Sequence, residues 1–339
     1  MAIIVNGAHS ALAKQEPPMT AKTLRVATVQ FQHRAGDKPY NLSRLEAFAR
    51  KASRAGAQIV VLPEMCVSGY WHVPNLDAEG VADLAESVTG PSITSVAALA
   101  ASLGIAIGVG WVERDEDGRF FNAYRVCFPD GSGHTHRKLH AFEHELIQSG
   151  DRYTVFDTPW GVRMAILICF DNNLIENGRA CALLGAQVLI APHQTGGTRS
   201  RSPHGMKPIP VYLWENRHDD PQALRDAFAG PNGRGWLMRW LPARAHDNGM
   251  FLIFSNGVGR DEDELRTGNA MILDPYGRII AESTAIEEDM VIAELDLSLI
   301  ADSSGQRWMT GRRPDLYAVL TEWRGDERSP RDVRFKLKE

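Results

Sequence analysis

The chain has 339 residues, of which 44% are hydrophobic and 23% are charged, and its formal net charge at pH 7 is -5. This balance is typical of a soluble globular protein that is long enough to bury a large core without disulfide or metal cross-links. The slightly acidic charge, with basic residues scattered along the chain, argues against a nucleic-acid binder, in which a basic stripe is usual.

The four cysteines are widely spaced and form no CxxC pair, which argues against a disulfide-rich secreted scaffold and against a zinc knuckle. The N-terminal residues do not have the pattern of a signal peptide, and no apolar run has the roughly 18 residues that a membrane span needs. We therefore expect a cytoplasmic protein without a membrane partner, in a compartment where thiols stay reduced.

Residues 1–22 predict a loose arm, after which apolar, β-branched runs alternate with segments of helical periodicity. The first half predicts strands at 24–31, 58–62, 105–113 and 122–128, and helices at 41–55 and 81–103, the second interrupted at Gly90–Pro91. The second half predicts strands at 153–157, 162–168, 188–190, 250–255, 270–273, 278–281 and 290–295, and helices at 174–184 and, with breaks, 223–248. No linker divides the chain, so the pattern indicates one α/β domain with layered sheets and outer helices.

Three polar residues stand where apolar strands end, which is where sites gather in α/β folds. Glu64 follows the strand at 58–62, Lys138 follows the strand at 122–128, and Cys169 ends the strand at 162–168. A thiol at a strand-to-helix turn lies near backbone N–H groups that favour the thiolate. A carboxyl group at the end of an apolar strand is partly desolvated, which suits it to proton transfer. Taken singly, however, such a cysteine is more typical of a buried structural thiol, and such a lysine of a solvated surface residue.

Taken together, the three residues have contexts that resemble the motifs of the nitrilase superfamily of carbon–nitrogen hydrolases. The corresponding segments are VVLPEMCVSGY (60–70), HRKLH (136–140) and ILICFDNNLIE (166–176). The resemblance extends over about residues 24–299, and three motifs in the right order are far more specific than any one of them. It implies a four-layer αββα sandwich, an assembly of two or more identical subunits, and chemistry without a metal or organic cofactor. The boundaries that follow are an arm at 1–22, the hydrolase domain at 23–300, and an extension at 301–339 that we expect to make subunit contacts.

The resemblance also implies a mechanism. Glu64 would take the proton of Cys169, whose thiolate attacks the substrate carbon and forms a thioester, and Lys138 with the backbone N–H of Phe170 would stabilise the oxyanion. The family carries a second glutamate shortly after the lysine. We expect it to be Glu145, with Glu143 as the alternative.

The residues after the cysteine favour amides among the possible substrates. True nitrilases commonly have Trp-Glu where this chain has Phe170–Asp171, and carbamoyl-amino-acid hydrolases have an arginine where it has Asn172–Asn173. A substrate carboxylate would therefore need another anchor, for which Arg199, Arg201 and Arg234 are candidates. Nitrile and N-carbamoyl substrates stay open as alternatives.

The residues expected to bind the substrate are His193, Gln194, Trp71 and Asn173. His193 and Gln194 open a long irregular stretch, 193–235, that could form a lid or a subunit contact.

Two other functions remain possible. His140, Glu143 and His144 match the HxxEH pattern of inverted zinc peptidases, for which metal analysis would decide. The chain could also be a non-catalytic binding module, although intact Glu64, Lys138 and Cys169 argue against that.

Overall fold

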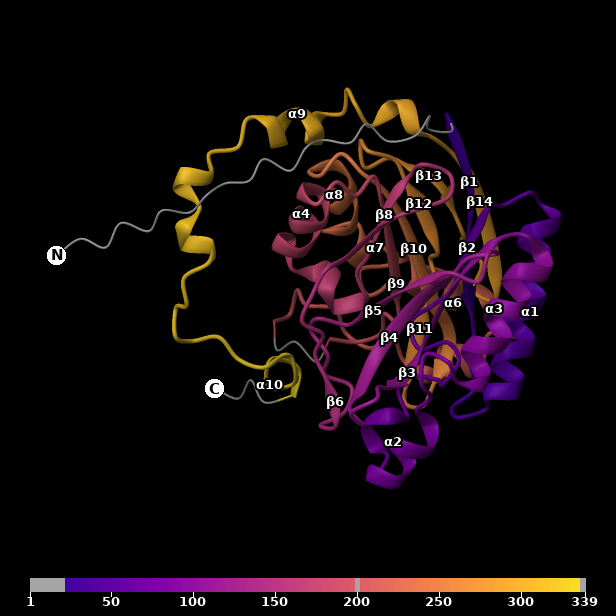
Figure 1. Cartoon of the computed structure of the whole chain (residues 1–339). Coiled ribbons are helices and arrows are strands. Elements are labelled where there is room, and N and C mark those ends of the chain that lie inside the picture. Colours follow the sequence, from indigo (N-terminus) through magenta and orange to yellow (C-terminus); the bar gives the residue numbers. More distant parts are fainter. Residues whose placement is uncertain (1–21, 199–201, 336–339) are drawn as a thin grey trace.

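The computed structural model describes residues 22–198 and 202–335 (Figure 1). Its strands are β1 (Thr23–Phe31), β2 (Ile59–Val61), β3 (Ala106–Arg114), β4 (Phe120–Cys127), β5 (Gly133–Arg137), β6 (Ile147–Gln148), β7 (Thr154–Asp157), β8 (Arg163–Ile166), β9 (Val188–His193), β10 (Phe251–Asp261), β11 (Glu264–Thr267), β12 (Met271–Leu273), β13 (Ile279–Glu282) and β14 (Asp289–Asp296). The α-helices are α1 (Lys38–Arg54), α2 (Ala78–Leu84), α3 (Pro91–Leu103), α4 (Ile175–Leu183), α5 (Val211–Glu215), α6 (Pro221–Ala229), α7 (Arg234–Leu237), α8 (Leu241–His246), α9 (Ser304–Thr310) and α10 (Pro330–Phe335). Short 3-10 helices are η1 (Val73–Asn75), η2 (Cys169–Asn173), η3 (Leu297–Leu299), η4 (Pro314–Leu316) and η5 (Ala318–Leu320).

The main strands form one hydrogen-bonded path in the order β5-β4-β3-β2-β1-β10-β9-β8-β7. This path consists of two half-sheets, because β1 and β10 pair only at Gln30 with Asn256 and at Phe31 with Gly257. The half-sheet from β5 to β1 faces the half-sheet from β10 to β7, and side chains such as Val61 and Ile253 meet between them in one buried cluster. The two half-sheets are therefore the inner layers of a sandwich.

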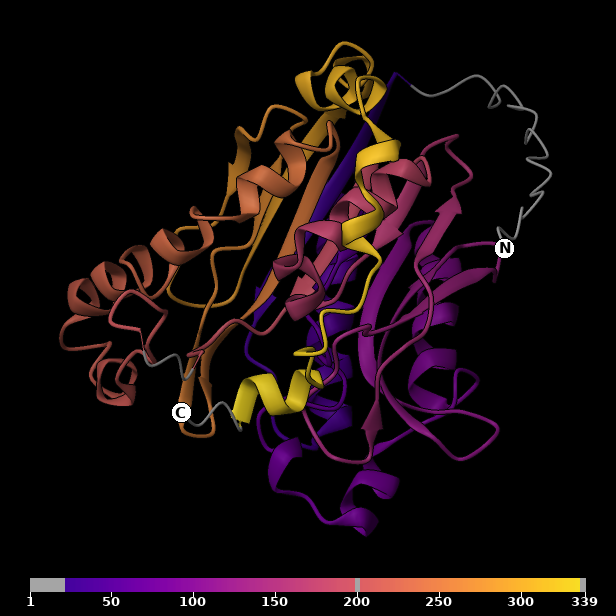
Figure 2. The ribbon, with the colours of Figure 1, turned by 90° about the vertical axis from the view of Figure 1, so that its left-hand side faces the viewer.

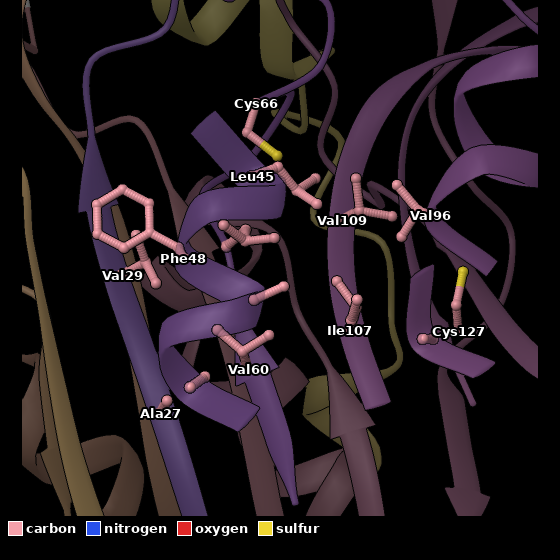
Figure 3. Close-up of a cluster of buried hydrophobic side chains, with 14 of the residues drawn as sticks. Ala27, Val29, Leu45, Phe48, Val60, Cys66, Val96, Ile107, Val109 and Cys127 are labelled. Carbon is pink, nitrogen blue, oxygen red and sulfur yellow. The ribbon is translucent and has the colours of Figure 1, made fainter. Parts of the chain in front are cut away.

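Helices cover the outer face of each half-sheet. On the first, Leu45 and Phe48 of α1 pack with Val29 of β1 and Val60 of β2 (Figure 3). On the second, α4 and α8 cover β9 and β10 in an equivalent cluster. Each apolar side chain of this size contributes about 1.5–3 kcal/mol when it is fully buried. The layers are thus helix, sheet, sheet and helix, which confirms the αββα sandwich expected from the sequence.

Local sequence accounts for these elements. Successive residues of β1 alternate between the outer cluster, which includes Val29, and the central cluster, which includes Val26, as the period of two requires. The helix α1 begins where the Asp37 carboxylate accepts a hydrogen bond from the backbone N–H of Tyr40 at 3.0 Å. The helix α3 ends at Gly104, whose φ of +66° suits a glycine cap.

The expected elements are largely present, and the main differences are in two regions. The segment expected to be helical at 223–248 forms α6, α7 and α8, because Gly230–Pro231 and Gly233 interrupt it. The strands β5 and β11 are not among the predicted elements, since polar residues dominate both. The predicted helix at 81–103 is divided into α2 and α3, with the break before Pro91 as expected.

The C-terminal segment leaves the sandwich and runs over its surface. After α9 it continues through η4 and η5 as an exposed strap, and it ends at α10, which returns to the body of the molecule (Figure 2). Most of the N-terminal arm expected at 1–22 lies outside the described residues. Among the described residues, no helix is both long enough and apolar enough to cross a membrane.

Candidate active site

Glu64, Lys138 and Glu143 form one buried polar cluster. The Lys138 ammonium donates to Oε1 of Glu64 at 2.7 Å and also contacts Oε1 of Glu143. The Asn122 amide, from β4, donates to the same two oxygens at 2.7 and 3.0 Å. All four side chains are inaccessible to solvent. Because breaking a buried pair leaves an uncompensated charge, the cluster holds its members tightly in place.

Close backbone packing fixes Glu64. The chain leaves β2 at Pro63 and turns flat against β3, so that a Cβ on Gly110 would lie 2.4 Å from the backbone nitrogen of Met65. Only glycine at that position in β3 lets the turn approach so closely. Glu64 Oε2 is buried and has no hydrogen-bond partner among the described residues. That oxygen is therefore free to accept a proton.

The electrostatics of the cluster suit proton transfer. Burial, followed by the charge of nearby Cys169, raises the pKa of Glu64 well above its ordinary value. Burial alone would lower the pKa of Lys138, but the carboxylates of Glu143 and Glu64 outweigh it and raise that pKa. Lys138 therefore stays an ammonium, while the raised pKa of Glu64 suits a group that takes up and then releases a proton.

Cys169 stands at a strained turn between β8 and η2. Its φ is +47°, a left-handed conformation that non-glycine residues adopt only where the surroundings impose it, at a cost of about 1–3 kcal/mol. Its side chain is partly exposed, whereas Cys66, Cys127 and Cys181 are buried. Burial raises the pKa of Cys66 and of Cys181 to about 12, which keeps those two thiols protonated. Cys169 is thus the cysteine that faces an open space.

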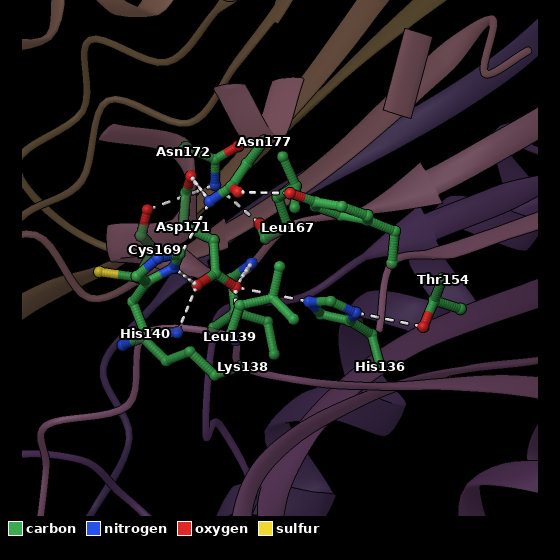
Figure 4. A network of polar contacts seen from close by, with 12 residues as sticks. His136, Lys138, Leu139, His140, Thr154, Leu167, Cys169, Asp171, Asn172 and Asn177 are labelled. Atoms are coloured by element: carbon green, nitrogen blue, oxygen red, sulfur yellow. Dashed lines mark hydrogen bonds and ion pairs between the residues drawn. The ribbon is translucent and has the colours of Figure 1, made fainter. Parts of the chain in front are cut away.

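The Asp171 carboxylate ties this turn to the segment that carries Lys138 (Figure 4). It accepts from the backbone N–H of Ile168 at 3.1 Å, of Leu139 at 3.2 Å and of His140 at 2.8 Å. It also contacts the ring nitrogens of His136 at 3.4 Å and His140 at 3.0 Å. Burial would raise the pKa of Asp171, but its contacts with His136 and His140 outweigh burial and hold that pKa well below its ordinary range. The sequence interpretation used Asp171 only to distinguish substrate classes and missed this structural role.

A cavity of about 340 Å³ opens beside Cys169. All of the residues expected to bind substrate line it: Trp71, Asn173, His193 and Gln194, together with Phe170. The sequence interpretation missed several other lining residues, namely Tyr70, Trp236, Trp240, Arg266 and Arg334. No signal in a single sequence associates Trp236, Trp240, Arg266 and Arg334 with the cysteine motif. Tyr70, in contrast, ends the glutamate motif and precedes Trp71, so its position could have been included.

His193 and Gln194 differ in what they can do within the cavity wall. Burial lowers the pKa of His193 to about 3, so its imidazole is neutral, and its Nε2 lies 3.1 Å from the Asn172 amide nitrogen. The Gln194 amide donates to the backbone carbonyl of Glu64 at 2.7 Å. Gln194 therefore connects the wall of the cavity to the carboxylate cluster.

The second glutamate beside Lys138 is Glu143, the alternative, and not Glu145, the residue that we expected. The Glu145 side chain is exposed, and Glu143 contacts Lys138 instead. The chain turns back immediately after β5, and the loop directs Glu143 inward and the residue two positions later outward. This tight turn could not be read from the spacing of the two glutamates.

The zinc-peptidase alternative loses its basis, because residues 138–146 contain no helix. Glu143 pairs with Lys138, His140 contacts Asp171, and His144 lies 3.0 Å from the backbone oxygen of Leu76. Within the described ranges no group of three His, Cys, Asp or Glu residues could hold a metal ion.

None of the three arginines suggested as carboxylate anchors is found in the cavity wall among the described residues. Arg234 forms an ion pair with Glu282 at 2.5 Å and does not line the cavity. Arg199 and Arg201 lie outside the described residues.

Comparison with known proteins places the chain among hydrolases. The family model described as carbon-nitrogen hydrolase matches residues 25–219 and 228–303. A protein of Pseudomonas protegens described as a hydrolase in the pqqF 5' region is 32% identical over 307 residues, which cover 89% of this chain and 93% of the relative. An (R)-stereoselective amidase of Pseudomonas sp. is 32% identical over 305 residues, which cover 88% of this chain and 95% of the relative.

The fold is also similar to that of a solved structure, a cysteine-to-alanine mutant of an amidase from Nesterenkonia AN1, of the nitrilase superfamily. The TM-score is 0.65 at 20% identity, and the match covers 90% of this chain and 99% of that one. At this identity the likeness supports the fold, while the sequence matches support the family.

Proposed function

Since this chain belongs to the carbon–nitrogen hydrolase family, as an amidase-type enzyme of the nitrilase superfamily, we propose that it hydrolyses a small amide through a thioester on Cys169. The observation that carries the proposal is the meeting of three strand ends. Glu64 and Lys138 pair directly, and the charge of Cys169 acts on Glu64 beside a cavity large enough for a small molecule. This arrangement supplies a nucleophile, a base and a fixed cation at one place.

In the first half of the reaction, Glu64 accepts the thiol proton of Cys169 and the sulfur attacks the amide carbon. The oxyanion that forms is stabilised by the Lys138 ammonium and the backbone N–H of Phe170. Each such preorganised donor is typically worth about 3–4 kcal/mol in the transition state. Glu64 then gives its proton to the leaving nitrogen, the C–N bond breaks, and ammonia or an amine departs.

In the second half, a water molecule attacks the thioester. Glu64 takes a proton from this water and gives it to the departing sulfur as the C–S bond breaks, which releases the thiol of Cys169 and a carboxylic acid. The raised pKa of Glu64 suits this alternation, because a group that takes up and releases a proton works best when its pKa lies near the operating pH. Glu143 acts as a positioning residue that keeps Lys138 charged and in place.

The cavity wall gives the substrate its surroundings. Trp71, His193, Gln194 and Asn173 line the space into which the acyl or amine group would extend. A neutral His193 offers hydrogen bonding without charge. We retain the cytoplasm as the expected compartment, where a reduced Cys169 would persist, and no cofactor takes part in any step.

Measurement of ammonia release over aliphatic amides, aromatic amides, N-carbamoyl compounds and nitriles tests this proposal. We expect an amide to be the best substrate and Cys169→Ala to abolish its turnover, while the matched control Cys181→Ser keeps it. Mass spectrometry of the quenched enzyme should detect an acyl adduct on Cys169. Turnover that survives in Cys169→Ala would contradict the mechanism, and a strong preference for nitriles would contradict the substrate class.

We also infer that the extension at 301–339 contacts a second copy of the chain. Its described part exposes large apolar side chains: Leu316, Val319, Leu320 and Trp323, the last 86% exposed. Such a cluster is typical of a protein-binding surface. Light scattering should give the mass of a dimer or larger assembly, and Val319→Glu combined with Trp323→Glu should shift it toward the monomer. An unchanged mass in this variant would contradict the inference that the extension contacts a second copy of the chain.

A further inference from the structure

Two guanidinium groups line the cavity that also contains Cys169. Arg266 belongs to β11 and is 2% exposed, and Arg334 belongs to α10, in the C-terminal segment. Arginine is rarely buried unless its N–H groups are paired. The hydrogen bonds of these two residues therefore need to be accounted for atom by atom.

Arg266 uses part of its guanidinium to hold the protein together. Its Nε donates to Asp261 at 2.8 Å, and its Nη1 donates to Glu264 at 3.1 Å and to the backbone oxygen of Gln194 at 2.9 Å. Its Nη2 is buried without a hydrogen-bond partner among the described residues. The rings of Tyr70 and Trp71 lie beside the group, at 5.0 and 5.3 Å from its central carbon.

Arg334 shows the same pattern from the other side. Its Nη2 donates to the backbone oxygen of Gly197 at 2.7 Å and lies 3.9 Å from the Glu264 carboxylate. Its Nε is buried and, within the described ranges, has no hydrogen-bond partner. Burial lowers the pKa of Arg334 below its ordinary value, as expected for a cation whose partners do not compensate fully for lost water.

The surroundings hold both arginines against the same short segment. A Cβ on Gly196 would lie 2.3 Å from Nη1 of Arg266, so only glycine leaves room for that guanidinium. The helix α10 is held to the body by a hydrogen bond from Arg331 to the backbone oxygen of Phe142 at 3.1 Å, and by contact of the Phe335 and Phe142 rings. Figure 2 shows how the strap after α9 brings α10 back to this place. A cation from the hairpin strand β11 and a cation from the C-terminal helix α10 thus meet in one wall.

A buried donor without a partner costs about 1–3 kcal/mol, and more when it is charged, so a ligand that accepts from it regains that amount. An arginine fork matches the geometry of a carboxylate or a phosphate, with which it can form two parallel hydrogen bonds. Asp261 and Glu264 balance the two cations, and a doubly charged group would be repelled by them. The wall therefore fits a singly charged, planar acceptor.

We propose that Arg266 and Arg334 bind a carboxylate of the substrate, so that the enzyme acts on amides that also carry a carboxylate group. This proposal rests on the proposed function, because the same cavity must hold the amide at Cys169. It assigns the role of carboxylate anchor to residues far from the cysteine motif. The C-terminal segment then completes the binding site of its own chain.

Kinetics with matched substrates test this assignment. The substrates are the monoamide of a straight-chain dicarboxylic acid, its methyl ester, and the plain aliphatic amide of equal length. We expect kcat/KM to be highest for the carboxylate-bearing amide. We expect Arg334→Gln to lower that value roughly 10- to 100-fold and to change the value for the plain amide less than about threefold. Arg334→Lys should recover part of the loss, and the exposed Arg328→Gln serves as the control from the same segment.

A binding measurement separates failure of this site from failure of the proposed chemistry. Calorimetry with glutarate on Cys169→Ala should show binding that is weakened at least tenfold by adding Arg334→Gln. Equal binding by the two proteins, or no binding by Cys169→Ala at millimolar glutarate, would overturn the carboxylate site. Turnover of the plain amide that depends on Cys169 would leave the proposed function intact in that case. Turnover that persists without Cys169 would refute the proposed function, whatever the calorimetry gives.

Discussion

The two sides of the cavity are built in different ways. The side with Cys169, Lys138 and Glu64 stands on strand ends of the two central half-sheets, where buried side chains fix every position. The side with Arg266 and Arg334 stands on the hairpin strand β11 and on the last described helix, α10. The first side carries groups that any amide requires, whereas the second carries groups that would distinguish one amide from another. In the function proposed above, the core thus fixes the residues for reactivity, and peripheral segments supply the residues for selectivity.

Removing Lys138 should damage the core-built side most. The substitution Lys138→Met leaves the Glu64 and Glu143 carboxylates adjacent and buried without their cation. We expect kcat to fall by at least about 10³-fold, and the free energy of unfolding to fall by about 3–5 kcal/mol. Ammonia release and urea unfolding measure the two effects. Lys38→Met is the matched control, because Lys38 pairs with Glu86 at 2.8 Å near the surface. Near-normal turnover in Lys138→Met would mean that the cluster is only structural.

Asp171→Asn tests how firmly the core holds the nucleophile turn. The native carboxylate accepts from three backbone N–H groups, so its loss should lower kcat roughly 10- to 100-fold and stability by about 2–3 kcal/mol. The pKa of Asp171 is depressed in the folded protein, so its stabilising effect is fully present above its ordinary value of 3.8 and is lost as pH falls below that value. The stability difference between wild type and variant should therefore be constant from about pH 5 to 7 and shrink below roughly pH 4. A difference that vanished already near pH 6 would contradict the assignment of this stabilisation to the ionised Asp171 carboxylate.

The same division explains what the sequence could predict. Glu64 and Cys169 follow apolar strands closely, so their local sequence carries both the strand and the residue at its end. Lys138 instead follows β5, a polar strand that is not among the predicted elements, and only its HRKLH motif marks it. Asp171 lies within the cysteine motif, but its partners come from the segment after β5, which a single sequence does not place beside it. Arg266 and Arg334 are harder still, because their meeting depends on the path of the strap between α9 and α10. A segment with few buried contacts has no hydrophobic periodicity, so its path cannot be predicted from its sequence.

Gly196→Ala should affect the peripheral side alone. A Cβ at this position collides with the Arg266 guanidinium, so the side chain must move out of the wall. We expect KM for a carboxylate-bearing amide to rise roughly tenfold, with kcat for the plain amide changed less than about twofold. The control is Gly311→Ala, where the nearest heavy atom to an added Cβ lies 3.6 Å away, an ordinary contact. Steady-state kinetics on both amides measure this effect. A parallel loss of kcat on both amides would show that the arginine side of the cavity also affects the chemical step.

The smallest effect on catalysis is expected for a substitution of Glu145. Glu143, two residues before it, provides a direct comparison between an exposed and a buried glutamate of one loop. Glu145 is exposed, so Glu145→Gln should change kcat/KM less than about twofold, as is usual for surface substitutions. Glu143→Gln removes a buried charge that contacts Lys138 and should lower kcat about tenfold or more. Kinetics of both variants on one amide measure the contrast. If Glu145→Gln were the more damaging of the two, the loop after β5 would have to rearrange when substrate binds. The fixed cluster described for the core-built side would then be a resting arrangement that differs from the reacting one.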